Sequence, residues 1–213
     1  MRITAFDADA GVRSRVRELG IADQVADTLA GAVAEADLVI LCVPVGAIAG
    51  LAADLAASVR PGAIVSDVGS VKAMLIDALR PHLPAGVHLV PAHPVAGTEF
   101  SGPDAGFASL FHQRWCIVTP APDTAPEAEA AICAFWEQLG AHVEVMDAAH
   151  HDRVLAVTSH VPHLIAYTIV GTASDLEEVT KSEVIKFSAG GFRDFTRIAA
   201  SDPTMWRDVF LNN

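Results

Sequence analysis

The stretch Ala63-Ile64-Val65-Ser66-Asp67-Val68-Gly69-Ser70-Val71-Lys72 contains the pattern on which the first part of the chain is built. It opens with a short apolar run that predicts a strand over Ala63–Ser66, and it leads into a helical pattern over Val71–Leu79. Polar and ionisable side chains lie between the two. In a parallel α/β sheet this position is the carboxyl end of a strand, where such sheets present groups to ligands.

The same strand-then-helix order recurs through the first two thirds of the chain. Continuous apolar strands that alternate with helices are typical of a parallel sheet, because helices cover both of its faces. Strands are predicted at Arg2–Phe6, Leu38–Val43, Ala63–Ser66, Val87–Val90, Trp115–Thr119 and His142–Val145. Helices are predicted from Val12 to Leu19, with Gly20 as the C-cap, and at Ile48–Val59, Val71–Leu79 and Ala125–Leu139.

From about residue 148 the strand signal stops and the pattern becomes helical. Helices are predicted at Ala148–Ser174, Leu176–Phe187, Arg193–Ala200 and Pro203–Leu211. Asp202 and Pro203 suit the N-cap and the first position of the last helix. The sequence therefore predicts an α/β domain over residues 1–147 and a helical domain over residues 148–213.

The composition indicates a soluble protein with enough apolar material for a core. The 213 residues are 52% hydrophobic and carry a net charge of −12. This charge disfavours nucleic acid and anionic membranes as partners, since both attract clustered Lys and Arg. The N-terminus has no signal-peptide pattern, and the uncharged stretch Leu38–Ala53 is too short to span a bilayer.

The three cysteines are widely spaced, which favours a reducing compartment such as the cytoplasm. Cys42 and Cys116 stand in apolar, strand-like runs, whereas Cys133 lies in a helical pattern. We therefore expect buried free thiols at Cys42 and Cys116.

Asp7 ends the first predicted strand, and two roles for it are equally supported. In a dinucleotide-binding fold an acid at this point accepts hydrogen bonds from the adenosine ribose. Alternatively, Asp7 caps the helix that begins near Asp9. Val43 and Pro44 follow another apolar strand at the ligand-binding edge, although Pro44 by itself is explained as a strand terminator.

Ser70 and His93 both follow predicted strands at this edge of the sheet. Ser70 either caps the helix after it or presents its hydroxyl to a ligand, and the cap is favoured for a lone serine. Asp67 and Lys72 are spaced to pair with one another. The position of His93 at a further strand end favours a catalytic role over a structural one.

The second half of the chain adds polar groups on predicted helices. Ser159 and His163 are four residues apart and share a helix face, and Pro162 predicts a local distortion. Four histidines that are near one another in the sequence raise the question of a metal: His150, His151, His160 and His163. Their spacing lacks a His-x-x-x-His pair with an intervening Glu, so we expect no metal.

Arg193 and Arg197 are also four residues apart and share a helix face. A guanidinium can bind a carboxylate through two parallel hydrogen bonds, so these arginines are candidates for binding a carboxylate ligand. The alternative is a surface ion pair between Asp194 and Arg197. Trp206 either lines a pocket or fills the core, and the core is favoured.

Together these segments resemble the prephenate/arogenate dehydrogenase family of tyrosine biosynthesis. The resemblance covers nearly the whole chain and rests on His-Pro-Val-Ala-Gly-Thr-Glu at 93–99, Ser-His-Val-Pro-His at 159–163 and Gly-Gly-Phe-Arg-Asp-Phe-Thr-Arg at 190–197, in this order. It implies a Rossmann-like, mostly parallel sheet followed by an all-helical segment that forms a homodimer. It also implies hydride transfer from prephenate or arogenate to NAD, with loss of the hydroxyl proton and of CO₂.

The resemblance implies a role for each candidate site residue. His93 is the general base for the substrate hydroxyl, Ser70 positions that hydroxyl and the nicotinamide, and Arg197 holds a substrate carboxylate. The implied substrate pocket also includes Thr98, Glu99, Ser159 and His163. The implied cofactor contacts are Asp7, Val43, Pro44 and Ser70, and the Asp7 carboxylate favours NAD over NADP because it repels a 2′-phosphate.

The chain departs from the family pattern at its ends. It lacks the first strand and the Gly-rich turn that cradle the pyrophosphate, and it stops where family members continue into further helices. We therefore expect an incomplete record of a longer enzyme, with no partner strand between the Asp7 strand and the strand Leu38–Val43. The alternative functions are a non-catalytic remnant that associates through its helices and a dehydrogenase of a small hydroxy acid.

Overall fold

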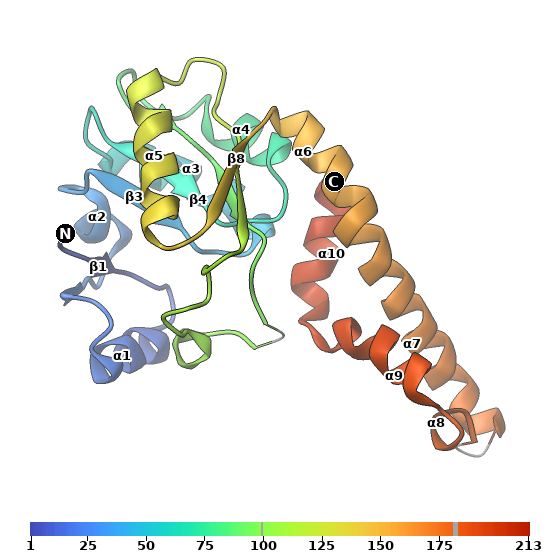
Figure 1. Cartoon of the computed structure of the whole chain (residues 1–213). Helices are drawn as coiled ribbons and strands as arrows, with labels where there is room; N and C mark the ends of the chain where they lie inside the picture. The colour runs from blue at the N-terminus through green and yellow to red at the C-terminus, as the bar shows by residue number, and fades with distance from the viewer. Residues whose placement is uncertain (99, 181–182) are drawn as a thin grey trace.

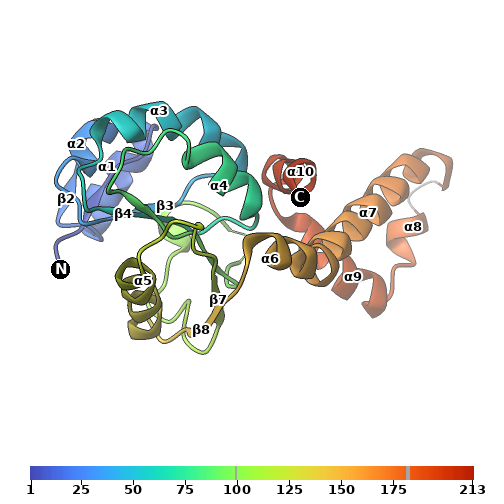
Figure 2. The ribbon, with the colours of Figure 1, turned by 90° about the horizontal axis from the view of Figure 1, so that it is seen from above.

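The chain folds into an α/β body and a helical arm that extends away from it (Figures 1 and 2). This computed structural model describes residues 1–98, 100–180 and 183–213. We call residues 1–147 the α/β body and residues 148–213 the helical arm. The last helix of the arm returns to pack against the body, so the C-terminus lies near the junction of the two parts (Figure 1).

The strands of the described residues form three hydrogen-bonded groups, and most pairs are parallel. In the first group β1 (Thr4–Ala5) pairs with β2 (Gln24–Val25). In the second, β4 (Ile64–Asp67) lies between β3 (Leu38–Leu41) and β5 (His88–Leu89). In the third, β7 (Trp115–Val118) lies between β6 (Ala92–Pro94) and β8 (His142–Val145). Only β6 with β7 is antiparallel. Within the described ranges no ladder joins β1 to β3.

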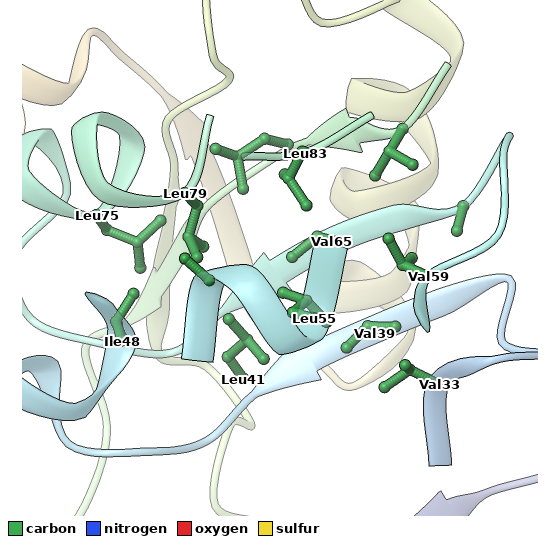
Figure 3. Close-up of a cluster of buried hydrophobic side chains, with 14 of the residues drawn as sticks. Val33, Val39, Leu41, Ile48, Leu55, Val59, Val65, Leu75, Leu79 and Leu83 are labelled. Atoms are coloured by element: carbon green, nitrogen blue, oxygen red, sulfur yellow. The ribbon is translucent and has the colours of Figure 1, made fainter. Parts of the chain in front are cut away.

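Helices cover both faces of the β3–β4 region, which explains its uninterrupted apolar sequence. α3 (Ile48–Ser58) and α4 (Ala73–Leu79) lie on one side, and α5 (Pro126–Gln138) lies on the other (Figure 2). Val39, Leu41 and Val65 pack with leucines of α3 and α4 (Figure 3). Leu38 and Ile64, the alternate residues of the same strands, pack with the cluster around α5.

Local sequence signals account for several helix ends. α1 (Ala10–Leu19) begins at the N-cap Asp9 and ends at Gly20, whose φ of 63° is the left-handed conformation that glycine adopts readily. α10 (Pro203–Asn212) begins at Asp202, whose carboxylate accepts N–H bonds from Thr204 and Met205. The caps predicted at Gly20 and Asp202 are therefore confirmed.

The helical arm begins with one long, continuous helix. α6 (Ala148–Leu155) passes through a π-helical turn, Ala156–His160, into α7 (Val161–Thr180). The wider turn lies just before Pro162, which has no N–H to donate, so the predicted distortion is confirmed. The remaining helices are α8 (Glu183–Lys186), α9 (Gly190–Thr196) with a 3₁₀ turn at Arg197–Ala200, and α10.

α10 joins the arm to the body through a small apolar cluster. Trp206 and Val209 of α10 are buried with Val45 and Val71 of the body. Trp206 therefore fills the core of this junction, as favoured from the sequence. This contact brings the arm back to the ends of β3 and β4, where the candidate site residues lie.

The arm contains a helix, Ala148–Leu176, that is long and apolar enough to cross a membrane by length and composition, with 17% of its window buried. The uncharged run at 154–174 lies within this helix and is longer than Leu38–Ala53, the stretch on which the sequence-based prediction rested. Val157 is 72% exposed and Leu164 is 48% exposed on this helix. Such an apolar surface on a globular protein usually marks a binding face.

Some local predictions were wrong. The short elements β2 and α2 (Leu29–Val33) were not predicted. α7 continues to Thr180, so the predicted helix Leu176–Phe187 is represented separately only by α8. Cys116 is buried as expected, but the predicted burial of Cys42 was wrong, because Cys42 is exposed at a cavity that it borders together with Asp7.

Candidate active site

His93 lies in the middle of β6, at the junction of the body and the arm. His93 follows the parallel strand β5, as predicted, but it also lies in a short strand that was not predicted: Ala92–Pro94 pairs antiparallel with β7, and His93 is opposite Ile117. The imidazole is 7% exposed. It is therefore a buried side chain that needs polar partners.

A buried ion pair fixes the backbone just before His93. The predicted pairing of Asp67 with Lys72 is confirmed, with 2.5 Å between Lys72 Nζ and Asp67 Oδ2. Lys72 Nζ donates to the Ala92 carbonyl at 2.8 Å, and the Ala92 N–H donates to Asp67 Oδ1 at 3.2 Å. The pair thus binds both polar groups of Ala92, the residue that precedes His93.

The two charges of this pair are compensated by hydrogen bonds. Burial lowers the pKa of Lys72, and the adjacent Asp67 carboxylate opposes that shift. Burial likewise raises the pKa of Asp67, and Lys72 and the Gly69 and Ala92 N–H groups oppose it. A buried pair needs such compensation, and here Lys72 Nζ has two acceptors and the Asp67 carboxylate has three donors.

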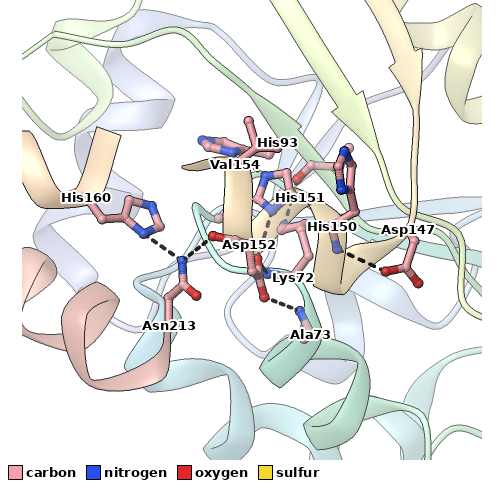
Figure 4. Close-up of polar contacts among 12 residues, drawn as sticks. Lys72, Ala73, His93, Asp147, His150, His151, Asp152, Val154, His160 and Asn213 are labelled. Atoms are coloured by element: carbon pink, nitrogen blue, oxygen red, sulfur yellow. Dashed lines mark hydrogen bonds and ion pairs between the residues drawn. The ribbon is translucent and has the colours of Figure 1, made fainter. Parts of the chain in front are cut away.

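His93 contacts a second histidine, from the arm, and that histidine contacts an aspartate (Figure 4). His93 Nδ1 lies 2.9 Å from His151 Nε2, and His151 Nδ1 lies 2.8 Å from Asp152 Oδ1. The Asp152 carboxylate also accepts the backbone N–H bonds of Lys72 and Ala73, each at 2.9 Å. Asp152 therefore holds the start of α4.

The favoured capping role of Ser70 was wrong. α4 has no capping hydrogen bond from a neighbouring side chain, because Asp152 from the arm binds the first free N–H groups instead. Ser70 is half-buried in the segment between β4 and α4. Its hydroxyl is thereby left for the other predicted role, presentation to a ligand.

The electrostatic environment keeps His93 neutral. Burial, followed by the charge of Lys72 and by His151 and His160, lowers its pKa well below the ordinary value of 6.5. Burial alone would raise the pKa of Asp152, but hydrogen bonds from His151 and from the Ala73 and Lys72 N–H groups lower it. The arrangement is a neutral imidazole backed by an ionised carboxylate.

On the arm, His163 is fixed by stacking and by one hydrogen bond. Its ring lies on Trp206 with 3.7 Å between centroids and a 17° angle between planes. Nδ1 donates to the Ser159 carbonyl at 2.8 Å, so Ser159 and His163 do lie together. Burial, together with the charge of Arg197, lowers the pKa of His163 although the bond to Ser159 opposes the shift.

Arg197 lies exposed in the 3₁₀ turn that follows α9. Asp194 and Arg197 are both described, and no ion pair joins them, so the alternative surface pair is wrong. The guanidinium remains close enough to His163 to affect its pKa. The Arg197 guanidinium is therefore a positive charge near His163 on the helical arm.

Two buried polar atoms near Trp206 have no hydrogen-bond partner among the described residues. They are His160 Nε2 and the indole Nε1 of Trp206. The other ring nitrogen of His160 lies 2.8 Å from the Asn213 side-chain nitrogen. Buried polar groups rarely remain unpaired, and a ligand or an ordered water is their usual partner.

Asp7 borders a cavity of about 300 Å³ at the other end of the body. Its carboxylate accepts the Asp9 N–H at 2.8 Å, but the N-cap of α1 is Asp9, so the capping alternative for Asp7 was wrong. Arg13 also lines the cavity; its buried Nε lies 3.8 Å from Asp27 Oδ1 and has no hydrogen-bond partner among the described residues. The apolar remainder of the wall includes Ala5, Phe6, Val12, Val16, Val25 and Pro103.

These residues fit the adenosine half of a dinucleotide. A carboxylate suits the ribose hydroxyls, and the apolar wall suits a flat base. Val43 and Pro44 do not line this cavity: Val43 packs against the core, and Pro44 precedes a 3₁₀ turn at Val45–Ala47.

The loop after β6 contains the two remaining predicted residues. Thr98 is exposed, and its hydroxyl accepts the Phe100 N–H at 3.3 Å. Glu99 lies outside the described residues. Among the residues that are described, no three His, Cys, Asp or Glu side chains are grouped to hold a metal ion.

Sequence reasoning missed His151 and Asp152 as site residues. His151 was weighed only as a metal ligand, and Asp152 was not singled out. Their adjacency at the start of a predicted helix was the available signal, but His93 is 58 residues away in the sequence.

Two family profiles match the chain end to end. One is described as prephenate dehydrogenase, nucleotide-binding domain, and matches residues 1–145. The other is described as prephenate dehydrogenase, dimerization domain, and matches residues 147–213.

Curated relatives and solved structures agree with these profiles. The chain is 46% identical to a cyclohexadienyl dehydrogenase of Zymomonas mobilis, covering 99% of this chain and 72% of the relative. It is 35% identical to a prephenate dehydrogenase of Bacillus subtilis, and it spans only 57% of that relative's length. The structure of A. aeolicus prephenate dehydrogenase with hydroxyphenyl propionate and NAD⁺ matches with a TM-score of 0.89 and 35% identity, over 99% of this chain and 73% of that one. The chain therefore belongs to the prephenate dehydrogenase family.

Proposed function

We propose that the protein catalyses the NAD-dependent oxidative decarboxylation of prephenate to 4-hydroxyphenylpyruvate, or of arogenate to tyrosine. The observation that carries this proposal is the buried, neutral imidazole of His93 at the junction between body and arm. A general base must be unprotonated at its working pH, and this environment keeps it so. Family membership and the NAD⁺-bound A. aeolicus relative support the reaction type.

The chemistry needs one proton acceptor and one hydride acceptor. Bound nicotinamide supplies the hydride acceptor. His93 takes the proton of the 4-hydroxyl as the C4–H bond breaks, and the electrons of the O–H bond form the ring carbonyl. The ring carboxylate then leaves as CO₂, and the electron pair of its C–C bond makes the ring aromatic and turns the carbonyl oxygen into a phenolate, which takes back the proton from His93. Ser70, near the end of β4, helps to position the hydroxyl.

Residues of the arm hold the substrate in this proposal. Arg197 binds a carboxylate through its guanidinium, which remains charged at all relevant pH values. Ser159 and His163 line the substrate pocket in this proposal, together with Thr98 and Glu99. The buried, unpartnered nitrogens of His160 and Trp206 add polar groups that a substrate or water would satisfy.

The cofactor contacts lie mainly on the body. Asp7 would accept hydrogen bonds from the adenosine ribose and disfavour the 2′-phosphate of NADP. Val43, Pro44 and Ser70 follow β3 and β4 and would border the nicotinamide half. The exposed apolar face of α6 and α7 is proposed to be buried by a second copy of the chain, as the dimerization-domain profile supports.

The direct test is to mix the purified protein with NAD and either prephenate or arogenate and to measure NADH absorbance. We expect NADH to form with one or both, and not with a small hydroxy acid used as the control substrate. NADH binding is measured separately by fluorescence titration. A protein that binds NADH yet oxidises neither substrate would contradict the proposed function.

A further inference from the structure

Three side chains from two parts of the molecule form a hydrogen-bonded row that ends at a helix start (Figure 4). His93 of β6 contacts His151 of α6, and His151 contacts Asp152, which binds the N–H groups of Lys72 and Ala73. His151 is fully buried, and Asp152 is 7% exposed. The row therefore has little water to compete with its hydrogen bonds.

The bonding partners decide which nitrogen of each ring carries a proton. An ionised carboxylate only accepts, so His151 Nδ1 must donate to Asp152. A neutral His151 then has a lone pair at Nε2, and His93 Nδ1 must donate to it. The remaining nitrogen of His93, Nε2, is consequently the acceptor. Among the described residues Nε2 has no hydrogen-bond partner, so it is free to receive a proton.

We propose that His151 and Asp152 are positioning residues that hold His93 in the tautomer with its proton on Nδ1 and Nε2 available as the base. This proposal deepens the proposed function and rests on it. Without the carboxylate, His151 could present an N–H to His93 instead. His93 would then have its proton on Nε2 and would be unable to accept another there.

The row also stabilises the positive charge that His93 gains when it receives a proton. When the substrate O–H bond breaks, a bond forms between His93 Nε2 and that proton, and the imidazole becomes positive. Transfer of the Nδ1 proton to His151 Nε2 moves the same charge next to Asp152. No other reactant is needed for either step. The carboxylate thus stabilises a charge that develops only during the reaction.

Other ionisable groups around His93 make this support necessary. Lys72 approaches from the start of α4, His151 from α6 and His160 from the π-helical turn. On β7, Cys116 is buried, and its pKa is raised to about 12 first by that burial, so its thiol stays neutral. Asp67 is already paired with Lys72. Asp152 is therefore the negative group left to balance a protonated His93.

The tautomer can be measured directly by ¹⁵N NMR of the histidine side chains in the protein without ligands. We expect His93 of the parent to be protonated on Nδ1. In Asp152→Asn the introduced amide donates toward His151, which reverses both rings and puts the His93 proton on Nε2. Asp147→Asn is the matched control, because Asp147 caps the same helix α6 without joining the row.

A parent protein with the His93 proton on Nε2, or an unchanged tautomer in Asp152→Asn, would overturn the proposal. This measurement does not depend on turnover. It can therefore contradict the proposed roles of His151 and Asp152 while the proposed function holds, and it can support those roles in a protein that oxidises neither substrate.

Kinetics supply the second readout. Asp152→Asn should lower kcat by roughly 10²- to 10⁴-fold with KM nearly unchanged, as expected when a base is held in the wrong tautomer. Asp147→Asn should stay near the parent. Equal kcat in Asp152→Asn and parent would overturn the proposal while leaving the proposed function intact.

Two substitutions of His151 separate positioning from packing. His151→Gln retains an acceptor toward His93 and a donor toward Asp152, whereas His151→Leu retains neither. We expect His151→Gln to recover about tenfold or more of the kcat that His151→Leu loses. Equal losses in two folded variants would show that His151 only fills space, and would overturn the proposal.

Discussion

In the α/β body, Leu55, Leu75 and Val65 have no exposed surface, whereas on the long helix of the arm Val157 is 72% exposed and Leu164 is 48% exposed. The body covers both faces of its central strands with its own helices. The arm instead presents a large part of its apolar surface, although α6 and α10 pack against the body. The body is thus stabilised mainly within one chain, whereas the arm requires a further surface to bury its apolar face.

The two regions also contribute different chemistry to the site. The body provides the imidazole of His93 and the ion pair beneath it, and the arm provides His151, Asp152, His163 and Arg197. Substitutions in the body should therefore affect turnover and folding. Substitutions in the arm should affect substrate binding and association, except at the residues that contact His93.

The largest effect is expected for His93→Asn in the body. Loss of the base should lower kcat by about 10²- to 10⁴-fold and change substrate affinity much less, because the interaction strengthens in the transition state. Steady-state kinetics with prephenate and arogenate measure both quantities. Unchanged turnover would exclude His93 as the base.

The pH profile of the parent tests the same residue. Burial and neighbouring positive charge lower the pKa of His93 well below 6.5, so the base is unprotonated at neutral pH. As pH falls through this lowered pKa, kcat/KM should decrease about tenfold per pH unit. An acidic limb centred above 6.5 would contradict the assignment, and the limb should be missing in His93→Asn.

Lys72→Met should cause the next largest effect, and it affects folding. It leaves the Asp67 carboxylate buried without its partner, which typically costs about 3 to 5 kcal/mol. The control in the arm is Arg207→Met, since Arg207 pairs with Asp208 at 2.6 Å but is 61% exposed. An exposed pair contributes about 1 kcal/mol or less. Urea unfolding measures the free energy of unfolding of both variants. Similar losses in the two variants would contradict the larger contribution expected from the buried pair.

Arg197→Ala tests the binding role of the arm. Removal of a charged partner for a substrate carboxylate should raise KM by about 10- to 100-fold, with kcat less affected. Arg193→Ala, four residues earlier on the same segment, is the control and should change KM little. Equal substrate affinity in Arg197→Ala and parent would remove Arg197 from the substrate site.

The smallest effect on the isolated chain is expected for Leu164→Lys, because this side chain is already half in water. If a second copy covers α7, the lysine should weaken dimer formation by about tenfold or more while leaving the body folded. Ile21→Lys is the control, since Ile21 is 55% exposed on the body. Sedimentation velocity over a concentration series gives the dimer affinity. A dimer as tight as the parent's would exclude this part of α7 from the interface.

Local signals in the sequence correctly predicted the order of the two regions and several element ends. Gly20 ends α1 because glycine adopts the left-handed conformation, and Asp202 starts α10 because its carboxylate accepts the first N–H groups. The pairing of Asp67 with Lys72 could also be predicted, because the two residues are five apart at one strand end. Each of these interactions joins residues that are close in the chain.

The hydrogen bonds that connect His93 to His151 and Asp152 could not be predicted from local signals. Asp152 lies 80 residues from the Lys72 N–H that it accepts, and only packing of α6 against α4 brings them together. The same packing excludes Ser70 from the capping role that local propensity favours. Exposure of Cys42 likewise depends on the cavity that Cys42 and Asp7 border in the folded body.

The sequence by itself therefore determined where most helices and strands form and that an α/β region precedes a helical one, and it supplied the candidate residues for the proposed chemistry. Short-range hydrogen bonding and apolar periodicity are sufficient for these. Only the tertiary structure decided that His93, His151 and Asp152 form one row and that the apolar face of α7 remains uncovered. Both depend on which surfaces meet, and contacts between distant segments leave no fixed spacing in the chain.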